Sequence, residues 1–423
     1  MRVDAGTQAD LDVEVASSSF GDRLEVNAWY GGELVAEHLD VLGWSIGWDA
    51  TRLVQGQSSW TFADPEGTLA PWALDDALAP GGAQLQVTWV SGSTGLEVPV
   101  GWYRIRSADP RETWRLVSYA PVPEDPSAYG AGAYGSGTYG VVSTSIPPVT
   151  KWVPGGGGQV TITADDLTCI PAELDRLDAE PVVASTSIAE AVRLLEGVIA
   201  VSVDAAVDDS PIPASLVYED GRMDAVEDHL TRCHAVHRMG PAADLEVLPE
   251  AGGDPVWTIA GGDEGVLIST ARTMSDEGLY NAATSTAESI AGSDAAPLVG
   301  RAYLDSGALR WGPGTPFGRR VIFHQSPANT QSGVDADAAT LLANRQVTGE
   351  VELTVECLTH PGLQLFDVVT LVAPSTAGEF PIEGRVTSMK ISGGAVIAKR
   401  MVLGVAVTAE VMAVFASRVR GHG

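Results

Sequence analysis

Residues 83–90, AQLQVTWV, decide the fold class that the sequence predicts. Alternate residues of an extended chain point to opposite faces, so the two kinds of residue in this stretch separate cleanly. The apolar set is Leu85, Val87 and Trp89, and the polar set is Gln84, Gln86 and Thr88. The stretch therefore predicts a strand with one buried and one solvated face.

Similar short segments lie on both sides of this strand. They read RLEVNAWY, GELVAEHL, VLGWSIGWD, SSWTFADP and VPVGWYRIRS, and the last three are rich in β-branched or aromatic residues. Gly31 and Gly32 separate the first two segments and favour a hairpin turn. Short strands at regular spacing, without an intervening helical period, predict an antiparallel barrel or sandwich in the first third of the chain.

The middle of the chain changes from a strand period to a helical one. Ser187 and Glu190 form a capping-box pattern ahead of AVRLLEG, and Gly197 is placed to end that helix. The side chains that fall on one face at helical spacing are Ile188, Val192 and Leu195. A second helix is expected over residues 223–239, where Gly240 and Pro241 stop it.

The last third returns to strands, in VELTVECL, DVVTLVAP, FPIEGRVTSMKIS and AVIAKRMVLGVAVTAE. One helix, VDADAATLLANRQ, precedes them, and Ala339, Leu342 and Ala343 are expected to line its apolar stripe. The sequence thus predicts a mainly β protein with a mixed α/β insertion. We expect three regions: 1–145, β; 146–275, a glycine-rich linker with a mixed α/β domain; and 276–423, β with one helix.

The composition of the chain already limits which functions are expected. The 423 residues include 25 Lys and Arg against 55 Asp and Glu, which gives a net charge of −30. Such a surface repels phosphates, so sequence-specific nucleic-acid binding is not expected. Two interpretations of the acidity remain open: solubility alone, or a negatively charged conduit along which DNA passes without sticking.

Cysteine usage and hydropathy indicate the compartment. Cys169, Cys233 and Cys357 are odd in number and widely scattered, which is no disulfide framework and suits a reducing cytosol. The stretch MRVDAGTQADLDVEV lacks the apolar segment of a secretory signal. Residues 401–416 are the most apolar stretch, but Glu410 interrupts them and they are too short to span a bilayer. We expect no membrane anchoring by this chain.

Catalytic and nucleotide signatures are missing from the sequence. There is no GxxxxGK[ST] phosphate loop, no HExxH helix and no G-x-S-x-G elbow. We therefore predict no catalytic, cofactor-binding or metal-binding residues, and a protein that is not an enzyme. The four glycines at 155–158 lie beside a proline-rich stretch and are interpreted as linker, since they do not open a helix directly after a strand.

One set of metal-ligand types does occur. His229, Cys233 and His237 stand at steps of four, so on one unbroken helix they would share a face. On such a helix His229 would lie ~12 Å from His237, because each residue rises about 1.5 Å. One ion could not reach all three, so we interpret the set as packing, with Cys233 as a small buried hydrophobe.

A set of repeated tyrosines and a group of arginines are two further patterns in the sequence. Tyr129, Tyr134 and Tyr139 recur in a glycine-rich stretch, either packed on a neighbouring segment or forming a contact surface for a partner subunit. A thin basic patch surrounds Trp311, and we expect its arginines to pair with an acidic neighbour rather than to bind nucleic acid. The patch consists of Arg301, Arg310, Arg319 and Arg320.

The ordered set of segments resembles the baseplate hub, or tail-hub minor tail, proteins of long-tailed actinobacteriophages. The matching stretches are SSWTFADPEGTLAPW, LAPGGAQLQVTWV, VPVGWYRI, ADDLTCIPAELDRLDAEPVVASTSIAEAVRLLEG, GLYNAATSTAE and DADAATLLANRQ followed by HPGLQLFDVVTL. Each is weak alone, and together they cover nearly the whole chain. One departure stands at Phe366-Asp367, where members of the family often have Gly-Asp before the strand.

The resemblance implies a specific architecture and role. It implies two tail-tube-like antiparallel β-barrels flanking a mixed α/β middle region, at about 1–145 and 276–415. Three chains would present six barrels and dock on a sixfold tail tube. A homotrimer would then join the tube or distal tail protein, and the tape measure protein, to the spike or fibre apparatus. DNA would pass through its channel without specific binding, and the protein would be assembled in the host cytoplasm into the virion tail tip.

Three rival functions stay open beside this one. The first is a distal tail or receptor-binding protein with a carbohydrate-binding barrel, since the eleven Trp could stack on sugars. Against it, Trp44, Trp48, Trp60 and Trp89 occupy strand patterns that predict core packing. The second is a cell-wall hydrolase, for which the sequence supplies no zinc or nucleophile motif. The third is a generic secreted β-protein.

Overall fold

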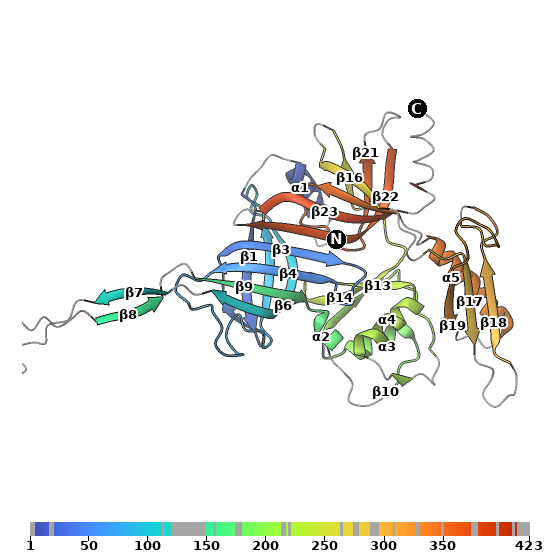
Figure 1. Cartoon of the computed structure of the whole chain (residues 1–423), viewed down its shortest axis with the longest axis horizontal. Helices are drawn as coiled ribbons and strands as arrows, with labels where there is room; N and C mark the ends of the chain where they lie inside the picture. The colour runs from blue at the N-terminus through green and yellow to red at the C-terminus, as the bar shows by residue number, and fades with distance from the viewer. Residues whose placement is uncertain are drawn as a thin grey trace, which may run out of the picture.

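The computed structural model describes most of the chain, and strands dominate it (Figure 1). The described residues are 5–16, 21–111, 114–119, 149–154, 158–173, 180–212, 217–218, 221–262, 265–273, 279–287, 296–307, 309–326, 330–347, 351–373, 380–394, 397–407 and 411–412. The tyrosine-rich stretch with Tyr129, Tyr134 and Tyr139 lies outside them, as do Gly155, Gly156 and Gly157.

One sheet of 13 strands draws on both ends of the chain. Its N-terminal half consists of β1 (Arg23–Tyr30), β2 (Glu33–Ala36), β3 (Val41–Asp49), β4 (Gly56–Ala63), β5 (Gln84–Val90), β6 (Glu97–Arg111) and β9 (Gln159–Asp166). Its C-terminal half consists of β15 (Trp257–Ala260), β16 (Leu267–Thr273), β20 (Val351–Cys357), β21 (Val368–Ala373), β22 (Phe380–Gly394) and β23 (Ile397–Val407). All pairings are antiparallel except that of β15 with β21.

The two halves are joined by direct pairing of β3 with β22, which we call the seam. Strand order runs β16-β20-β23-β22-β3-β4-β9-β6-β5-β1-β2, and β21 branches from β22. At the seam Ile46 lies opposite Ile391, and both side chains are buried. The predicted mainly β fold is confirmed. Among the described strands the path is open from β16 to β2, so two separate closed barrels are not confirmed.

The alternation that predicts strand β5 is borne out by burial. Leu85, Val87 and Trp89 are at most 3% exposed, whereas the polar residues between them stay partly exposed. The predicted hairpin also forms, because Gly31 and Gly32 both adopt positive φ between β1 and β2. The four tryptophans expected in the core, Trp44, Trp48, Trp60 and Trp89, are all buried.

A smaller α/β unit lies beside the seam. Its strands are β10 (Glu180–Pro181), β11 (Ala200–Val203), β12 (Val217–Tyr218), β13 (Ala235–Met239) and β14 (Asp244–Pro249), and its helices are α2 (Cys169–Glu173), α3 (Ser187–Leu195) and α4 (Arg222–Arg232). Strand β14 pairs in parallel with β11 and antiparallel with β13. Helices α3 and α4 pack on each other over a separate apolar core.

Helix α3 forms where the sequence predicts it, but its N-terminal cap and its buried face differ from the prediction. The N-cap is Thr186, and Glu190 bonds the backbone N–H of Ala184 instead of closing a capping box. Gly197 has positive φ and follows the helix end, as expected. Of the predicted stripe Ile188 and Leu195 are buried, but Val192 is 37% exposed, because the core contacts pass through Ala191 and Leu194.

The prediction of one helix over residues 223–239 is wrong in its second half. Helix α4 ends at Arg232, Cys233 is its C-cap, and His234 turns the chain with φ of 49°. Residues 235–239 then form β13, because pairing with β14 satisfies their backbone groups. His237 is therefore on a strand, and His229, Cys233 and His237 do not share a helix face.

A second small unit lies at the side of the molecule away from β7 and β8 (Figure 1). It contains β17 (Ala282–Ala287), β18 (Leu298–Tyr303), β19 (Val321–Gln325) and α5 (Gln331–Val347). The predicted helix is confirmed, but Ala339 and Ala343 are exposed, so its predicted stripe is wrong apart from Leu342. The buried face repeats every four residues and consists of Val334, Ala338 and Leu342.

Two remaining elements lie at the periphery. Strands β7 (Trp114–Tyr119) and β8 (Val149–Pro154) form a two-stranded arm that projects from β6 (Figure 1). Helix α1 (Ala5–Ala16) packs Leu11 into the core, although the sequence shows no strong helical period there. None of the helices in the described part of the chain has the length and hydropathy needed to cross a membrane.

Candidate assembly surfaces

A row of hydroxyl side chains crosses the seam on the open face of the main sheet. Strand register places them side by side: Ser107, Thr163, Ser59, Ser45 and Ser392, on β6, β9, β4, β3 and β22. Ser107 and Thr163 share a hydrogen bond of 2.7 Å between their hydroxyl oxygens. The row forms because successive strands keep polar residues on this face and apolar residues on the other.

The same face is hollowed into a groove of about 650 Å³ at the seam. Its charged groups are largely compensated: Arg106 lies 3.2 Å from Asp165, and Arg52 lies 3.2 Å from Asp49. Burial raises the pKa of the Asp165 carboxyl, against the attraction of Arg106. Hydroxyls, amides and paired charges give this groove hydrogen-bonding capacity without a strong field of either sign.

A buried arginine fixes the α/β unit to the main sheet. Arg238 on β13 is 6% exposed and lies 2.6 Å from Glu246 and 2.9 Å from Asp367. Its guanidinium also donates to the carbonyl oxygen of Leu365 at 2.7 Å. Two carboxylates and a carbonyl satisfy the buried charge, so this contact positions the unit beside β21 and β22.

Strand β13 is also hydrogen-bonded to the N-terminal half of the main sheet. The Gln55 amide donates to the carbonyl oxygen of His237 at 2.9 Å. Burial lowers the pKa of the His237 imidazole to about 4. Nearby, Asp166 accepts the backbone N–H of Gly56 at 2.6 Å, and burial raises the pKa of its carboxyl to about 6. Strand β13 is thus fixed to both halves of the sheet.

Phe366 and Asp367, which stand where a Gly-Asp step is expected, form the turn before β21. Phe366 has φ of 67°, a conformation that glycine adopts without strain and bulky residues rarely adopt. The phenyl ring is nevertheless buried, with the Arg385 guanidinium 5.4 Å from its centre. Asp367 accepts the backbone N–H of Gln364 and the Arg238 guanidinium. Packing and these bonds offset the backbone strain.

The three possible metal ligands lie in a packed interior. The His229 imidazole is fully buried, and its Nε2 lies 2.5 Å from the Tyr218 hydroxyl. The Cys233 thiol lies 3.3 Å from the Ser210 hydroxyl, and His237 is on β13. Within the described residues no cluster of three or more metal-binding side chains occurs. The fourth glycine of the 155–158 stretch, Gly158, leads into β9, where a Cβ would meet the Asp64 carbonyl oxygen at 2.5 Å.

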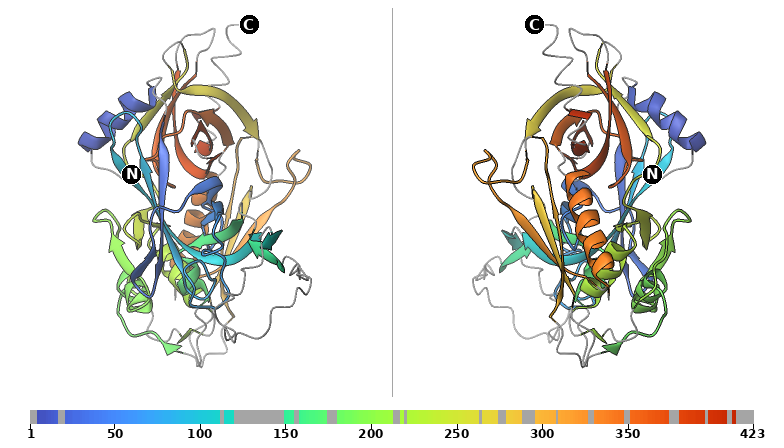
Figure 2. Two further views of the ribbon diagram at one scale, coloured as in Figure 1. Left: turned by 90° about the vertical axis from the view of Figure 1, so that its left-hand side faces the viewer. Right: turned by 90° about the vertical axis from the view of Figure 1, so that its right-hand side faces the viewer.

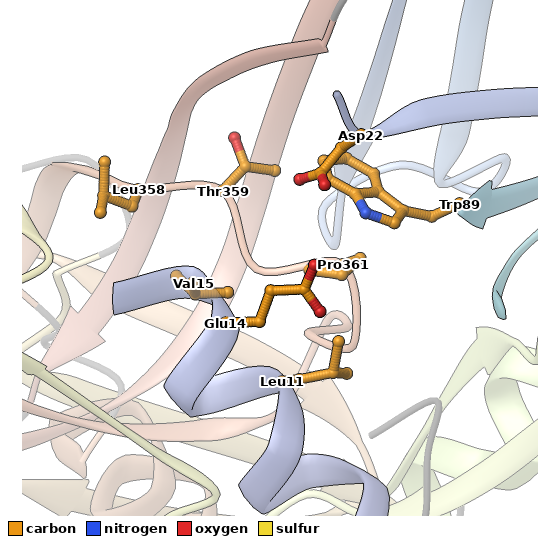
Figure 3. Close-up of a pocket in the computed structure, with 8 residues that line it drawn as sticks. All are labelled: Leu11, Glu14, Val15, Asp22, Trp89, Leu358, Thr359 and Pro361. Atoms are coloured by element: carbon orange, nitrogen blue, oxygen red, sulfur yellow. The ribbon is translucent and has the colours of Figure 1, made fainter. Parts of the chain in front are cut away.

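Helix α1 connects the two halves of the sheet from outside. Its Glu14 accepts hydrogen bonds from Ser93 and Thr94 in the loop after β5. Figure 3 shows Leu11, Glu14 and Val15 beside the segment that carries Thr359 and Pro361. The enclosed space there is only about 20 Å³, room for about one water molecule, so it is no ligand site.

The β7–β8 arm exposes apolar side chains. Register places Leu116 opposite Trp152, and Trp114 stands two residues before Leu116 on β7, so these three side chains share one face of the arm. Trp114 is 53% exposed, Leu116 55% and Trp152 66%. Isolated two-stranded hairpins are marginal in water, and clustered apolar side chains indicate a contact surface. No pattern in the sequence predicts the arm, because its two strands are 29 residues apart with a glycine-rich stretch between them.

The fold is similar to those of two solved tail proteins. The tail protein from Neisseria meningitidis MC58 matches with a TM-score of 0.56 and 14% identity, over 92% of this chain and 97% of that chain. The 43 kDa tail protein of prophage MuSo2 from Shewanella oneidensis matches with a TM-score of 0.52 and 10% identity, over 92% and 99%. At such identity the likeness is one of fold. Neither a protein-family model nor a curated protein matches the sequence.

Proposed function

We propose that this protein is a structural, non-enzymatic subunit of a phage tail tip, of the baseplate hub type found in long-tailed actinobacteriophages. The observation that carries the proposal is the fold shared with two tail proteins over 92% of this chain. That likeness extends over nearly the full length of both neighbours, so it includes the seam and the units beside it. A fold alone hosts many functions, and the surfaces described above supply the further support.

In this proposal the two halves of the main sheet act as two tail-tube-like barrel modules of one chain. The N-terminal half contributes seven strands and the C-terminal half six, and the seam fixes them side by side. Three copies would then present six modules in a ring that matches a sixfold tail tube. We retain the regions 1–145, 146–275 and 276–423 as the proposed division of the chain, with β9, β15 and β16 of the middle region completing the two halves of the sheet.

The open face of the sheet is the proposed wall of the DNA channel. Its row of hydroxyls and its compensated charges offer little attraction to phosphates, and the net charge of −30 adds repulsion. DNA would pass such a wall without being held. The exposed apolar arm and the α5 unit are the proposed contacts to neighbours: further copies, the tail tube or distal tail protein, the tape measure protein and the spike or fibre proteins.

The mass of the purified full-length chain tests the ring. Light scattering and native mass spectrometry should give three times 44.0 kDa, and electron microscopy with a labelled chain should place it at the tip of the tail in the virion. Assembly in the host cytoplasm would appear as the same trimer in lysates before particles form. A protein that stays monomeric at high concentration and is absent from particles would rule the proposal out.

A further inference from the structure

Among the residues that the structure describes, the three-stranded sheet of the α5 unit has one covered face and one open face. Strand register sets the rows: Thr284 of β17 lies beside Arg301 of β18 and Phe323 of β19. Helix α5 crosses the other face, where a Cβ on Gly300 would meet the Val334 carbonyl oxygen at 2.2 Å. Because residues alternate along a strand, Arg301 and Phe323 point away from the helix.

Aromatic side chains gather on and beside the open face. Phe323 is 76% exposed and Tyr303 49% exposed. The Trp311 ring lies 5.4 Å from the Tyr303 ring, and the Arg319 guanidinium lies 5.4 Å from the Trp311 ring. Large exposed aromatics beside arginines have the composition of interface centres, where Tyr, Trp and Arg are enriched.

The charge of this segment is opposite to that of the chain. Residues 298–325 contain four arginines and one aspartate, whereas the whole chain has 25 Lys and Arg against 55 Asp and Glu. Within the part of the chain that the structure describes, Arg301, Arg310 and Arg319 have no carboxylate within ion-pair distance. Three of the four arginines predicted to pair with an acidic neighbour, Arg301, Arg310 and Arg319, thus have no such partner among the described residues of their own subunit.

We propose that this surface, the arginine–aromatic face, docks on an acidic surface of a second copy of the chain. The face is defined by Arg301, Tyr303, Arg310, Trp311, Arg319 and Phe323. The inference rests on the ring proposed above, and it names the contact through which adjacent copies recognise each other. Charge complementarity selects the occupant, because outside this segment each copy carries a large excess of carboxylates.

The position of the unit fits this role. The α5 unit lies at the edge of the molecule, beside the main sheet and at the far side from the β7–β8 arm (Figures 1 and 2). A projecting unit can reach a neighbouring subunit in a head-to-tail ring, where different surfaces of the two copies meet. Single-stranded nucleic acid is the other occupant that aromatic and arginine side chains can hold. Each chain's net charge of −30 opposes that occupant.

The experiment reverses the charge of the face in the full-length protein. The double variant Arg301→Glu with Arg319→Glu changes two exposed side chains. Its matched control, Arg23→Glu with Arg232→Glu, changes the net charge by the same amount at exposed positions outside the face. Self-association is measured by sedimentation over a concentration series. The face variant should raise the dissociation constant roughly 100-fold, and the control by less than about threefold.

A salt series and an uncharged variant separate the contribution of charge to self-association from that of the aromatic side chains. Raising the salt from about 0.05 to 0.5 M should weaken association of the wild type and have little effect on the face variant. Phe323→Ser should raise the dissociation constant roughly tenfold at low salt. Circular dichroism checks that every variant keeps the folded signal, and the exposure of these side chains predicts that it does.

The outcomes are distinguishable. A wild-type trimer that the face variant retains with unchanged affinity overturns this inference and leaves the ring standing. A wild type that stays monomeric at every concentration overturns both. Binding of a 20-nucleotide oligo-dT by the wild type, lost in the face variant, overturns the second copy as the occupant and identifies nucleic acid in its place.

Discussion

Two regions of this protein have aromatic residues on strands, and these residues are buried in one region and exposed in the other. In the main sheet, Trp60 of β4 is fully buried, lies directly opposite Trp44 of β3 and stacks with Phe62. In the α5 unit, Phe323 of β19 is 76% exposed. The main sheet curves over a common core, whereas among the described residues the small sheet is covered by a helix on one face only. Burial of an aromatic therefore depends on whether a second layer covers its face.

The largest expected effect is in the aromatic cluster of the main sheet. Trp60→Ala removes a buried indole, its ring contacts and the hydrogen bond from its Nε1 to the Ser58 hydroxyl. We expect the free energy of unfolding to fall by about 3–5 kcal/mol. Urea denaturation followed by circular dichroism measures it. A loss under about 1 kcal/mol would mean that the main sheet does not depend on this cluster.

Loss of the buried arginine should cost nearly as much. Arg238→Ala leaves Glu246 and Asp367 without their common partner, and we expect a loss of about 3 kcal/mol. Arg319→Ala, at an exposed arginine of the α5 unit, is the matched control and should change stability by less than about 0.5 kcal/mol. Thermal unfolding compares the two. Equal effects would contradict the distinction between a buried and an exposed guanidinium.

The dependence of stability on pH tests the burial of His237. Its imidazole has a folded pKa of about 4, against about 6.5 when unfolded, so protonation favours the unfolded chain. The contribution to stability is complete above pH 6.5 and is lost as the pH falls toward 4. The stability difference between wild type and His237→Gln should therefore shift by up to about 3 kcal/mol between pH 7 and 4. Urea unfolding at several pH values measures it, and a constant difference would contradict it.

A smaller effect should come from the strained turn before β21. Phe366→Gly and Phe366→Ala both lose the buried ring, but only glycine adopts φ of 67° without strain. We expect the glycine variant to be more stable than the alanine variant by about 1 kcal/mol, the reverse of the usual order. Paired urea denaturation curves decide this. Alanine equal to or more stable than glycine would show that the turn is not strained.

The smallest expected effect completes the comparison with Trp60. Phe323→Ala removes an exposed ring, so the free energy of unfolding of the monomer should change by less than about 0.5 kcal/mol. Measurement at low protein concentration keeps association out of the result. A loss approaching that of Trp60→Ala would show that the open face of the α5 unit is covered within the subunit.

Local patterns in the sequence carry much of the fold. Alternation in residues 83–90 places Trp89 in the core, and Gly31 with Gly32 sets the first hairpin. Helix α3 also follows from its period. The end of α4 does not, because the helical pattern in the sequence continues after Cys233 and the pairing of β13 with β14 overrides it. Tertiary contacts decided that boundary.

The assembly surfaces are harder to predict because they depend on distant pairings. The row of hydroxyls needs the register of β3 against β22, which no local signal sets. Nothing in the sequence around Arg238 indicates that it binds Glu246 and Asp367 together. The arginines around Trp311 are the exception. Their number against an acidic background marks a surface in the sequence, and the structure adds that Arg301, Arg310 and Arg319 lack carboxylate partners in the described part of the subunit.

The seam has a consequence for synthesis on the ribosome. Strand β3 is made early, but the strand it pairs with there, β22, follows roughly 340 residues later. At about 5–20 residues per second, that edge waits some 20–70 s for its native neighbour. Until then its free backbone groups are open to pairing with other nascent chains. Helper proteins that shield this edge during translation should therefore raise the yield of correctly folded protein more than later refolding does.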